Sequence, residues 1–281
     1  MDIKNSQNFL YDKSLVKKIV SLANFNKDIK VLEIGPGKGI ITNELLDNDY
    51  KVTAIELDDK LFNNLNNTIS NNNLTLINED ILNYEIEEKH NVFSNIPFNI
   101  TTNLIQKLLQ DKNVLDLYLI MQYEPFLRFS KYDDYLTYKY LLFSPFYGMN
   151  IEYKFKNSDF KPEPKARIIL ASFKQKKNSD ISINDMDLYL NFISYLFNKK
   201  SKLLFEKIEK LFSEKQREII KKTLKVEDDY LFTSLTYENI IYLFNTFNKY
   251  ANDRVKKIVE GFYKEKEDNN PHKNFSNKNN W

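Results

Sequence analysis

The sequence predicts an α/β fold in which a largely parallel sheet is followed by a small, mostly helical second domain. Apolar runs of strand length alternate with helical periodicity over the first 173 residues, which is typical of βαβ units. Three glycines, Gly35, Gly37 and Gly39, directly follow one of these runs and precede a helix-like pattern. Beyond the polar segment 174–180 the apolar spacing is helical only.

Composition narrows the class of protein. The 281 residues suit one large and one smaller domain, and 42% hydrophobic with 28% charged residues is ordinary for a soluble globular chain. No window is apolar enough to span a membrane, and the N-terminus lacks the apolar region of a secretory signal, so we expect a cytoplasmic protein. Cysteine is absent and only His90 and His272 are present, so no metal site is expected.

The elements of the first domain follow from the apolar spacing. Leu15, Ile19 and Leu22 mark a first helix. Strands are predicted over 31–34, 51–56, 74–77, 91–95, 116–122, 147–155 and 167–173. Further helices are predicted over 40–46, 61–65, 101–109 and 135–143, with Thr101 as the cap of the third. No helix separates the last two strands, so we expect an antiparallel hairpin at one edge of the sheet.

The polar run 174–180 suggests the domain boundary. We predict a first domain over 1–176, a small helical domain over 177–264, and a polar, disordered tail over 265–281. Within the second domain, Thr236-Tyr237-Glu238 opens one of the predicted helices. Residues 175–281 hold 20 Lys+Arg against 16 Asp+Glu, an excess that is weakly indicative of nucleic-acid contact.

The glycine turn and two carboxylates predict a site for an adenosine-bearing ligand. The spacing GxGxG differs from the dinucleotide fingerprint, because the third glycine comes one residue early. Glu56 ends the next strand, 21 residues after Gly35, where a carboxylate can accept both hydroxyls of a ribose. Asp80 ends the third strand and can accept the amine of an adenine. Taken singly, the loop could be a plain αβ turn and Glu56 a surface residue.

The end of the fourth strand, Asn95-Ile96-Pro97-Phe98, indicates the reaction. Proline fixes the backbone, so the Asn95 side-chain oxygen can be held as an acceptor for the N–H of an amine. Phe98 offers a flat face on which a base can stack. A proline turn after a buried strand is the simpler interpretation, but the position beside three ligand-type strand ends favours an active site.

These motifs resemble, in order and spacing, those of the S-adenosylmethionine-dependent ribosomal RNA adenine N6-methyltransferases. The motifs are Gln7-Asn8-Phe9, Glu33 to Gly39, Glu56, Asp80, Asn95 to Phe98, and Phe160-Lys161-Pro162-Glu163-Pro164-Lys165. The match is close over residues 4–175 and looser beyond, notably at Leu235-Thr236-Tyr237-Glu238. It implies a Rossmann-like S-adenosylmethionine-dependent methyltransferase fold with a small α-helical C-terminal domain. Residues 1–176 would then form the S-adenosylmethionine-binding catalytic domain, and residues 177–264 the helical RNA-binding domain.

Within that family the chain looks most like the Erm type, which modifies 23S rRNA and gives macrolide, lincosamide and streptogramin B resistance. The sister type dimethylates small-subunit (16S) RNA and usually reads FGQ near the N-terminus and NLPY in the later motif. Asn5-Ser6-Gln7 and Ile96 before Phe98 favour the Erm type here. The resemblance also implies 23S rRNA as partner, a monomer, and a cytoplasmic location.

The resemblance implies a role for each matching residue. The cofactor site would consist of Gln7, Asn8, Leu10, Gly35, Gly37, Gly39, Glu56, Leu57, Asp80, Ile81 and Asn95. The catalytic set would be Asn95, Ile96, Pro97, Phe98 and Phe160. Asn95 and the Ile96 carbonyl would accept hydrogens from the target N6, while Phe98 and Phe160 would sandwich the base. Many members of the family have Tyr where Phe98 stands, so a hydroxyl contact would be missing.

Three alternatives remain open. A small-subunit dimethyltransferase is the nearest, since it shares the motifs. A non-catalytic nucleic-acid-binding module is disfavoured because Asn95, Pro97 and Phe98 are retained. Protein-glutamine and DNA-adenine methyltransferases usually carry a second proline where Ile96 stands. Candidate RNA phosphate contacts are Lys4, Lys131, Lys161, Lys165 and Arg167.

Overall fold

The computed structural model describes residues 8–97, 100–131 and 136–268. The chain divides into two compact units, Met1–Leu127 with Gly148–Gln175 and Arg128–Tyr147 with Lys176–Trp281. The segment 128–147, which the sequence analysis placed in the sheet domain, therefore belongs to the second unit. Helix α6 (Tyr138–Phe143) packs there on α7 (Met186–Asn198), where the Tyr189 hydroxyl donates to the Leu141 carbonyl at 2.7 Å.

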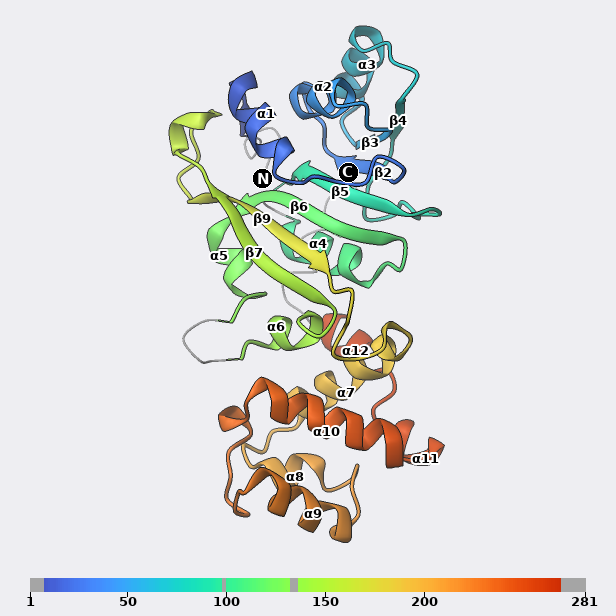
Figure 1. The fold of residues 1–281 in the computed structure, drawn as a ribbon, viewed down its shortest axis with the longest axis vertical. Coiled ribbons are helices and arrows are strands. Elements are labelled where there is room, and N and C mark those ends of the chain that lie inside the picture. Colours follow the sequence, from blue (N-terminus) through green and yellow to red (C-terminus); the bar gives the residue numbers. More distant parts are fainter. Residues whose placement is uncertain (1–7, 98–99, 132–135, 269–281) are drawn as a thin grey trace. The chain divides into compact units, whose positions relative to one another are not determined.

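The first unit is built on a seven-stranded sheet with the order β4-β3-β2-β5-β6-β9-β7 (Figure 1). Its strands are β2 (Lys30–Ile34), β3 (Val52–Glu56), β4 (Leu74–Asn78), β5 (His90–Asn95), β6 (Val114–Gln122), β7 (Tyr147–Lys154) and β9 (Ile168–Gln175). The five strands β4, β3, β2, β5 and β6 run parallel to one another, and β9 is antiparallel to β6. The last two strands lie together at one edge, as predicted. The order reverses at β2, and the carboxyl ends of β2 and β5 meet at this switch point.

Helices of the first unit bury one apolar face each against the sheet. They are α1 (Lys13–Ser21), α2 (Ile40–Asp47), α3 (Asp59–Thr68), α4 (Thr101–Gln110) and α5 (Tyr123–Leu127). Leu15 and Ile19 of α1 share one core cluster with Leu45 of α2 and with Val31 and Phe93 of the sheet. Burial of such side chains contributes about 2 kcal/mol each, so the spacing seen in the sequence fixes which helix face meets the sheet.

One capping prediction was wrong. Ile100, not Thr101, occupies the N-cap position of α4, and no side chain caps this helix end. Thr101 is already inside the first turn, and its Oγ1 donates to the Pro97 carbonyl at 3.2 Å. The hydroxyl thus points back to the preceding proline turn, where it ties the start of α4 to the motif that ends β5.

A second, two-stranded sheet pairs segments that are far apart in sequence. Strand β1 (Phe9–Leu10) runs antiparallel to β8 (Phe160–Lys161), with Phe9 opposite Lys161 and Leu10 opposite Phe160. The 3₁₀ turn Asn157–Asp159 precedes β8. Two-residue strands are too short to show a period, so the sequence analysis did not predict them.

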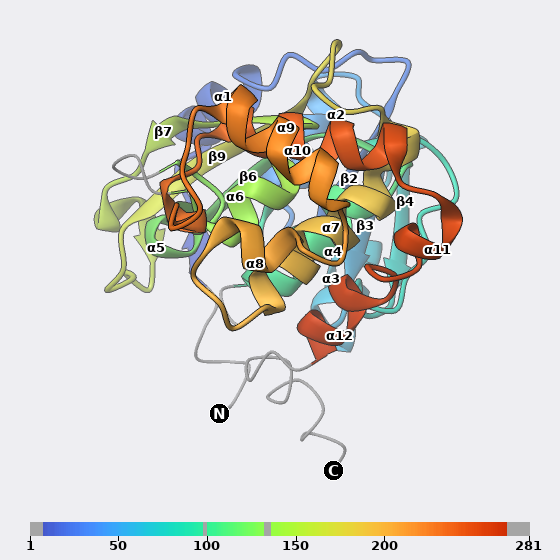
Figure 2. The same cartoon turned by 90° about the horizontal axis from the view of Figure 1, so that it is seen from below.

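The second unit is helical. Besides α6 and α7 it contains α8 (Leu204–Ile208), α9 (Glu214–Leu224), α10 (Tyr237–Tyr250), α11 (Asp253–Lys256) and α12 (Phe262–Asp268). Helices α7 and α10 lie side by side in both views (Figures 1 and 2). Aromatic rings of the two helices pack against each other. The ring centroids of Tyr189 and Phe244 are 5.0 Å apart, and those of Phe192 and Phe247 are also 5.0 Å apart.

The ends of this unit can be compared with the prediction. Thr236 caps α10, accepting from the Asn239 amide at 3.3 Å while the Asn239 side chain accepts from Thr236, so the predicted helix start is confirmed. The tail was expected to begin at 265, but α12 continues to Asp268. Residues 269–281 lie outside the described residues. None of the described helices is long and apolar enough to cross a membrane.

Candidate active site

The glycine turn links the end of β2 to α2. All three glycines have positive φ, +64° for Gly35, +60° for Gly37 and +78° for Gly39, which L side chains rarely adopt. A Cβ on Gly37 would stand 2.8 Å from Cε1 of Phe9, and the Gly37 backbone therefore lies directly under that ring. Gly39 forms the N-cap of α2. The fold itself therefore requires glycine at position 37, where the Phe9 ring of β1 covers the turn.

Glu56 ties this loop to the end of β3. Its Oε2 accepts from the Gly37 amide at 3.0 Å, and its Oε1 accepts from the Asp58 amide at 3.0 Å. The side chain is almost completely buried. Each carboxylate oxygen can accept a further hydrogen bond, so the pair of oxygens suits the two hydroxyls of a ribose. Leu57, which follows, exposes 56% of its surface beside this carboxylate.

Glu33 is a second buried carboxyl beside the loop. It precedes Ile34 and Gly35 in β2 and is 1% exposed. Burial raises the pKa of Glu33 to about 8, and the nearby carboxylate of Glu56 adds to this shift, while Thr42 beside it partly opposes the shift. Its Oε2 has no hydrogen-bond partner among the described residues. Such an atom is costly unless a ligand or water satisfies it.

Asp80 and Ile81 follow β4. The Asp80 Oδ1 accepts from the Leu82 amide at 2.9 Å, which forms a tight turn and holds the carboxylate half-buried, and Ile81 is buried beside it. Lys107 of α4 fixes the same loop, because its Nζ donates to the carbonyls of Leu82 at 2.9 Å and Tyr84 at 2.6 Å. Sequence reasoning missed Lys107; the only signal was a lysine on an otherwise apolar helix face.

Asn95 connects three of the sequence motifs. Its Nδ2 donates to the Asn8 carbonyl at 2.9 Å, and the Nδ2 of Asn8 donates to the Pro162 carbonyl at 2.6 Å. Leu10, the next predicted cofactor residue, is buried in the strand pair with Phe160. Because the amide nitrogen of Asn95 is used by the chain, its oxygen is the atom left to accept a hydrogen from a ligand.

The turn after Asn95 is held from several sides. The Ile96 amide donates to the Ile120 carbonyl of β6 at 3.2 Å, and the Ile96 side chain is buried. Pro97 packs near Gly35, since a Cβ there would meet its Cγ at 3.9 Å. Ser94, which was not predicted, donates from Oγ to the Ile34 carbonyl and joins β5 to the glycine turn. Its only signal was a small polar residue in an apolar strand.

One predicted site residue lies elsewhere than expected. Phe160 is fully buried, with its ring 5.2 Å from that of Phe155 in an edge-on contact. The pairing of Leu10 with Phe160 turns both side chains into the hydrophobic core, so the ring has no face open to a base in this structure. Gln7 and Phe98, which carry further predicted roles, lie outside the described residues.

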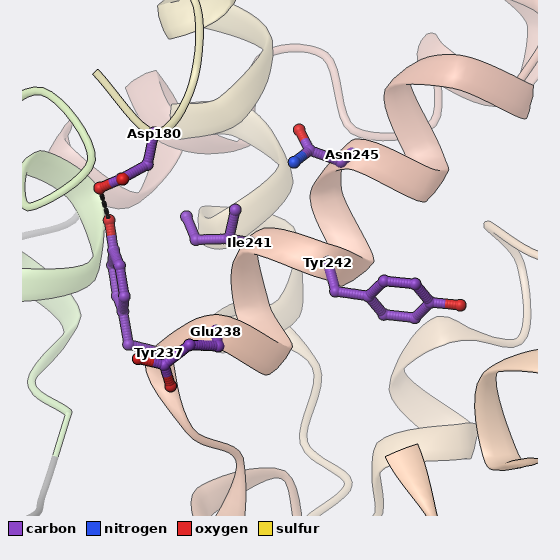
Figure 3. A pocket seen from close by; sticks show the side chains of 6 residues that line it. All are labelled: Asp180, Tyr237, Glu238, Ile241, Tyr242 and Asn245. Carbon is purple, nitrogen blue, oxygen red and sulfur yellow. Dashed lines mark hydrogen bonds between the residues drawn. The ribbon is translucent and has the colours of Figure 1, made fainter. Parts of the chain in front are cut away.

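A cavity in the second unit shares no residue with this site (Figure 3). It measures about 450 Å³ and is lined by Asp180, Tyr237, Glu238, Ile241, Tyr242 and Asn245. The Tyr237 hydroxyl points at Asp180 and donates to its Oδ2 at 2.8 Å (Figure 3). Burial, reinforced by that bond, raises the pKa of Tyr237 well above its usual range, so the phenol stays neutral.

The edge of the sheet fits S-adenosylmethionine. The glycine turn is a backbone cradle without Cβ atoms. The two carboxylates at successive strand ends and the unpartnered Oε2 of Glu33 are hydrogen-bond acceptors. S-adenosylmethionine carries the matching donors, which are an amine, an ammonium and hydroxyls. Lys38, the one cation in the loop, lies 5.2 Å from the centre of the Phe9 ring. In the described part of the chain, no group of three acidic, His or Cys side chains could hold a metal ion.

Comparisons with known proteins agree with this assignment. The family model described as "Ribosomal RNA adenine dimethylase" matches residues 2–249. An "rRNA adenine N-6-methyltransferase" of Limosilactobacillus reuteri is 30% identical over 88% of this chain and 96% of its own length. A "Ribosomal RNA small subunit methyltransferase A" of Mycoplasmopsis pulmonis is 31% identical over 75% of this chain and 84% of its own.

Solved structures show the same fold. The crystal structure of the 23S rRNA methyltransferase ErmE, at 21% identity, covers 86% of this chain and 100% of its own with a TM-score of 0.70. A dimethyladenosine transferase from Plasmodium falciparum, also at 21%, covers 86% and 98% with a TM-score of 0.69. The predicted Rossmann-like S-adenosylmethionine-dependent methyltransferase fold is thereby confirmed. The chain belongs to the ribosomal RNA adenine dimethylase family and is an S-adenosylmethionine-dependent rRNA adenine-N6 methyltransferase.

Proposed function

We propose that this enzyme methylates N6 of one specific adenine in 23S rRNA, once or twice, and thereby confers resistance to macrolides, lincosamides and streptogramin B. The observation that carries the proposal is the small helical second unit, with its capped helix α10, because a short helical C-terminal domain agrees with the Erm type. Ile96, in place of leucine, supports the same choice. We further propose that the enzyme acts as a cytoplasmic monomer.

A second candidate is a 16S rRNA dimethyltransferase acting in ribosome biogenesis. Several relatives that are 30–31% identical carry the name "Ribosomal RNA small subunit methyltransferase A", and they are as similar to this chain as those named rRNA adenine N-6-methyltransferase. Both candidates use the same chemistry at Asn95. They differ in which RNA is presented to the site.

S-adenosylmethionine, when bound, supplies a methyl group activated by a positively charged sulfur. We propose that Gly35, Gly37 and Gly39 let the backbone approach it, that Glu56 accepts from its ribose, and that Asp80 accepts from its adenine amine. Gln7, Asn8, Leu10, Leu57 and Ile81 would complete the cofactor site. The buried carboxylate of Glu56 also favours a cation at this edge of the sheet.

The reacting amine is activated by acceptors rather than by a base. The lone pair of adenine N6 is delocalised into the ring, so the amine is a poor nucleophile. The oxygens of Asn95 and of the Ile96 peptide can accept its two hydrogens and favour a tetrahedral nitrogen, whose lone pair is free to attack. Both acceptors are fixed in advance, Asn95 by its bond to Asn8 and Ile96 by its bond to Ile120 and by Pro97.

The target base must leave its stack to reach Asn95. We propose that Phe98 offers the aromatic face that offsets part of this cost. Phe160, being buried against Phe155, supports β8 instead, and so holds the Pro162 carbonyl that positions Asn8.

Primer extension on RNA from cells that carry the gene tests the choice of substrate. A reverse-transcription stop in the peptidyl-transferase region of 23S rRNA, together with raised macrolide tolerance, is expected. The gene with Asn95→Ala serves as the control that should give neither. A stop confined to the 3′ end of 16S rRNA would overturn the 23S assignment. Mass spectrometry of the modified fragment then distinguishes one methyl group from two.

A further inference from the structure

Two pairs of an aromatic ring and a cation lie at the surface beside Asn95. In the first, Lys161 Nζ is 4.4 Å from the centre of the Tyr11 ring. In the second, Arg167 Cζ is 4.2 Å from the centre of the Tyr123 ring. Such pairs occur about once per 70–80 residues, so their presence alone carries little information. Their placement relative to Asn95 is what matters.

The first pair is connected to Asn95 through the small sheet. Tyr11 directly follows β1 and is 50% exposed, and its hydroxyl donates to the Ser158 carbonyl at 2.8 Å, which fixes the ring. Lys161 lies in β8, opposite Phe9. The same two segments carry Asn8 and Pro162, through which Asn95 is positioned. The Tyr11 ring therefore stands three residues along the chain from the residue that holds Asn95.

The second pair lies at the same edge of the main sheet. Asn95 is paired with Ile120 of β6, and Tyr123 directly follows the end of that strand. The Tyr123 amide donates to the Arg167 carbonyl at 2.9 Å, so Arg167 is fixed just before β9. The Arg167 side chain is 70% exposed and also binds Glu124, with Nη2 to Oε1 at 2.9 Å. Both pairs are thus carried by segments that are hydrogen-bonded to Asn95 or continue the strand paired with it.

Tyr11 is half exposed and Tyr123 is half-buried, and neither ring belongs to the core cluster of the first unit. Aromatic faces held rigidly at a surface stack on unpaired bases of any sequence, and neighbouring cations bind the phosphates that join those bases. Lys161 carries a compact point charge suited to a phosphate. Arg167 is partly neutralised by Glu124, so its planar guanidinium is better suited to stacking beside Tyr123.

We propose that Tyr11 with Lys161, and Tyr123 with Arg167, bind the unpaired RNA nucleotides on either side of the target adenine while that base is turned toward Asn95. Tyr11 and Tyr123 stack on the flanking bases, and Lys161 binds a phosphate between one of them and the target. The inference rests on the proposed RNA substrate, whether 23S or 16S, and it assigns substrate recognition to residues outside the cofactor and amine sites.

The test measures methyl transfer to a short RNA stem-loop containing the target adenine, with KM for RNA and kcat determined separately. Tyr11→Leu and Tyr123→Leu are each expected to raise KM for RNA about tenfold with kcat and cofactor affinity unchanged, which is within the range of one lost base stack. Tyr11→Phe keeps the ring and should restore the KM. Lys161→Gln should raise KM and reduce the slope of log affinity against log salt by about one.

Tyr250→Leu is the matched control. Tyr250 is 61% exposed and has Lys249 Nζ 5.1 Å from its ring centre, so it is a pair of the same kind on the helical unit. Because the helical unit is itself predicted to bind RNA, any rise in KM that Tyr250→Leu causes should remain when the nucleotide beside the target is abasic. An abasic nucleotide beside the target should remove the difference between Tyr11→Leu and the unaltered enzyme, because the base that stacks is then missing.

The outcomes separate this inference from the proposed function. If the unaltered enzyme does not methylate the 23S stem-loop, the proposed function fails, whatever the variants do. If it methylates the 23S or the 16S stem-loop and the tyrosine and lysine variants keep the same KM, or if the abasic nucleotide removes the effect of Tyr250→Leu as well, the recognition role is overturned. Cofactor titration of each variant shows whether Tyr11→Leu still folds, and Lys161→Gln tests the same surface without altering a packed ring.

Discussion

Two buried ionisable side chains, one in each unit, have their hydrogen-bonding groups satisfied to different degrees. Lys207 of α8 is 5% exposed, and its Nζ donates to the carbonyls of Leu196 and Lys199, both at 2.7 Å. Glu33 of β2 is 1% exposed, and its Oε2 has no partner among the described residues. The chain itself satisfies the lysine, whereas the glutamate lies beside the glycine turn with acceptor capacity left over.

This difference distinguishes Lys207, which stabilises the fold, from Glu33, which is available to a ligand. The last carbonyls of a helix lack hydrogen-bond donors within the helix. Lys207 supplies such donors at the end of α7, so its charge stabilises the fold. Burial nonetheless lowers the pKa of Lys207, and burial raises the pKa of Glu33 to about 8. An incompletely satisfied group costs stability, and it is retained where a ligand can complete its bonds.

Asn95→Ala tests this distinction with the largest expected effect. The Asn95 amide resembles Glu33, since the chain uses its nitrogen and we assign its oxygen to the substrate. We expect kcat for methyl transfer to fall about 100-fold or more, because an acceptor prepared for the reacting amine is lost. Cofactor affinity, measured by calorimetry, should change little.

Asn113→Ala is the matched control, because the Asn113 amide also bonds to a backbone carbonyl, that of Ile86, but precedes β6 at the opposite end of the sheet. It should lower stability and leave kcat unchanged. Equal turnover in Asn95→Ala and the unaltered enzyme would contradict the assignment of the site.

Glu33→Gln tests the unpartnered acid. Because the folded state raises the pKa of Glu33 from 4.5 to about 8, the folded protein binds this proton more tightly than the unfolded chain. The free energy of unfolding should therefore fall as pH rises from about 4.5 to about 8, by an amount on the order of a few kcal/mol. Glu33→Gln cannot ionise, so urea unfolding of this variant should lack that decline.

Cofactor affinity gives the second measurement on Glu33→Gln. If the carboxyl serves the cofactor, the variant should bind S-adenosylmethionine less well at every pH in that range. Parallel pH profiles of stability for the variant and the unaltered enzyme would show that Glu33 is ionised in the folded state, and the contrast with Lys207 would be lost.

Sequence reasoning identified the parts of the site that depend on local pattern. The β2 strand, the turn at Gly35 to Gly39, and the strand ends at Glu56 and Asn95 each have a signal within a few residues, and the structure has them where the pattern predicted. Parallel pairing then brings strand ends to one edge of a sheet whatever their distance in sequence.

What the sequence did not reveal depends on contacts between distant segments. The β1–β8 pairing, and with it the burial of Phe160, follows from which side chains fill the core, and no local period reports it. The membership of 128–147 in the second unit depends likewise on the contact of Tyr189 with Leu141. The sequence showed Glu33 as part of a motif, but it did not reveal that the Oε2 atom of Glu33 lacks a hydrogen-bond partner.

Lys207→Met examines the paired charge. Methionine keeps the apolar stem, but the carbonyls of Leu196 and Lys199 lose their donor, so the free energy of unfolding should fall by about 2 kcal/mol. Urea denaturation measures this, with exposed Lys210→Met as the control expected to stay within about 0.5 kcal/mol. A change in cofactor affinity as large as that of Glu33→Gln would contradict a purely structural role.

The smallest expected effect comes from two glycines with similar backbone strain. Gly37 (φ +60°) and Gly261 (φ +82°) both adopt conformations that L side chains rarely adopt, and alanine should cost about 1 kcal/mol at either. At Gly261 a Cβ would meet nothing within 4 Å, whereas at Gly37 it would lie 2.8 Å from Phe9 Cε1. Gly37→Ala should therefore cost about 1 kcal/mol more, and only it should weaken cofactor binding, because the Phe9 ring must move off the loop. Equal unfolding energies and equal cofactor affinities for the two variants would mean that the ring moves away without cost, and that the close approach of Phe9 does not hold the cofactor loop in place.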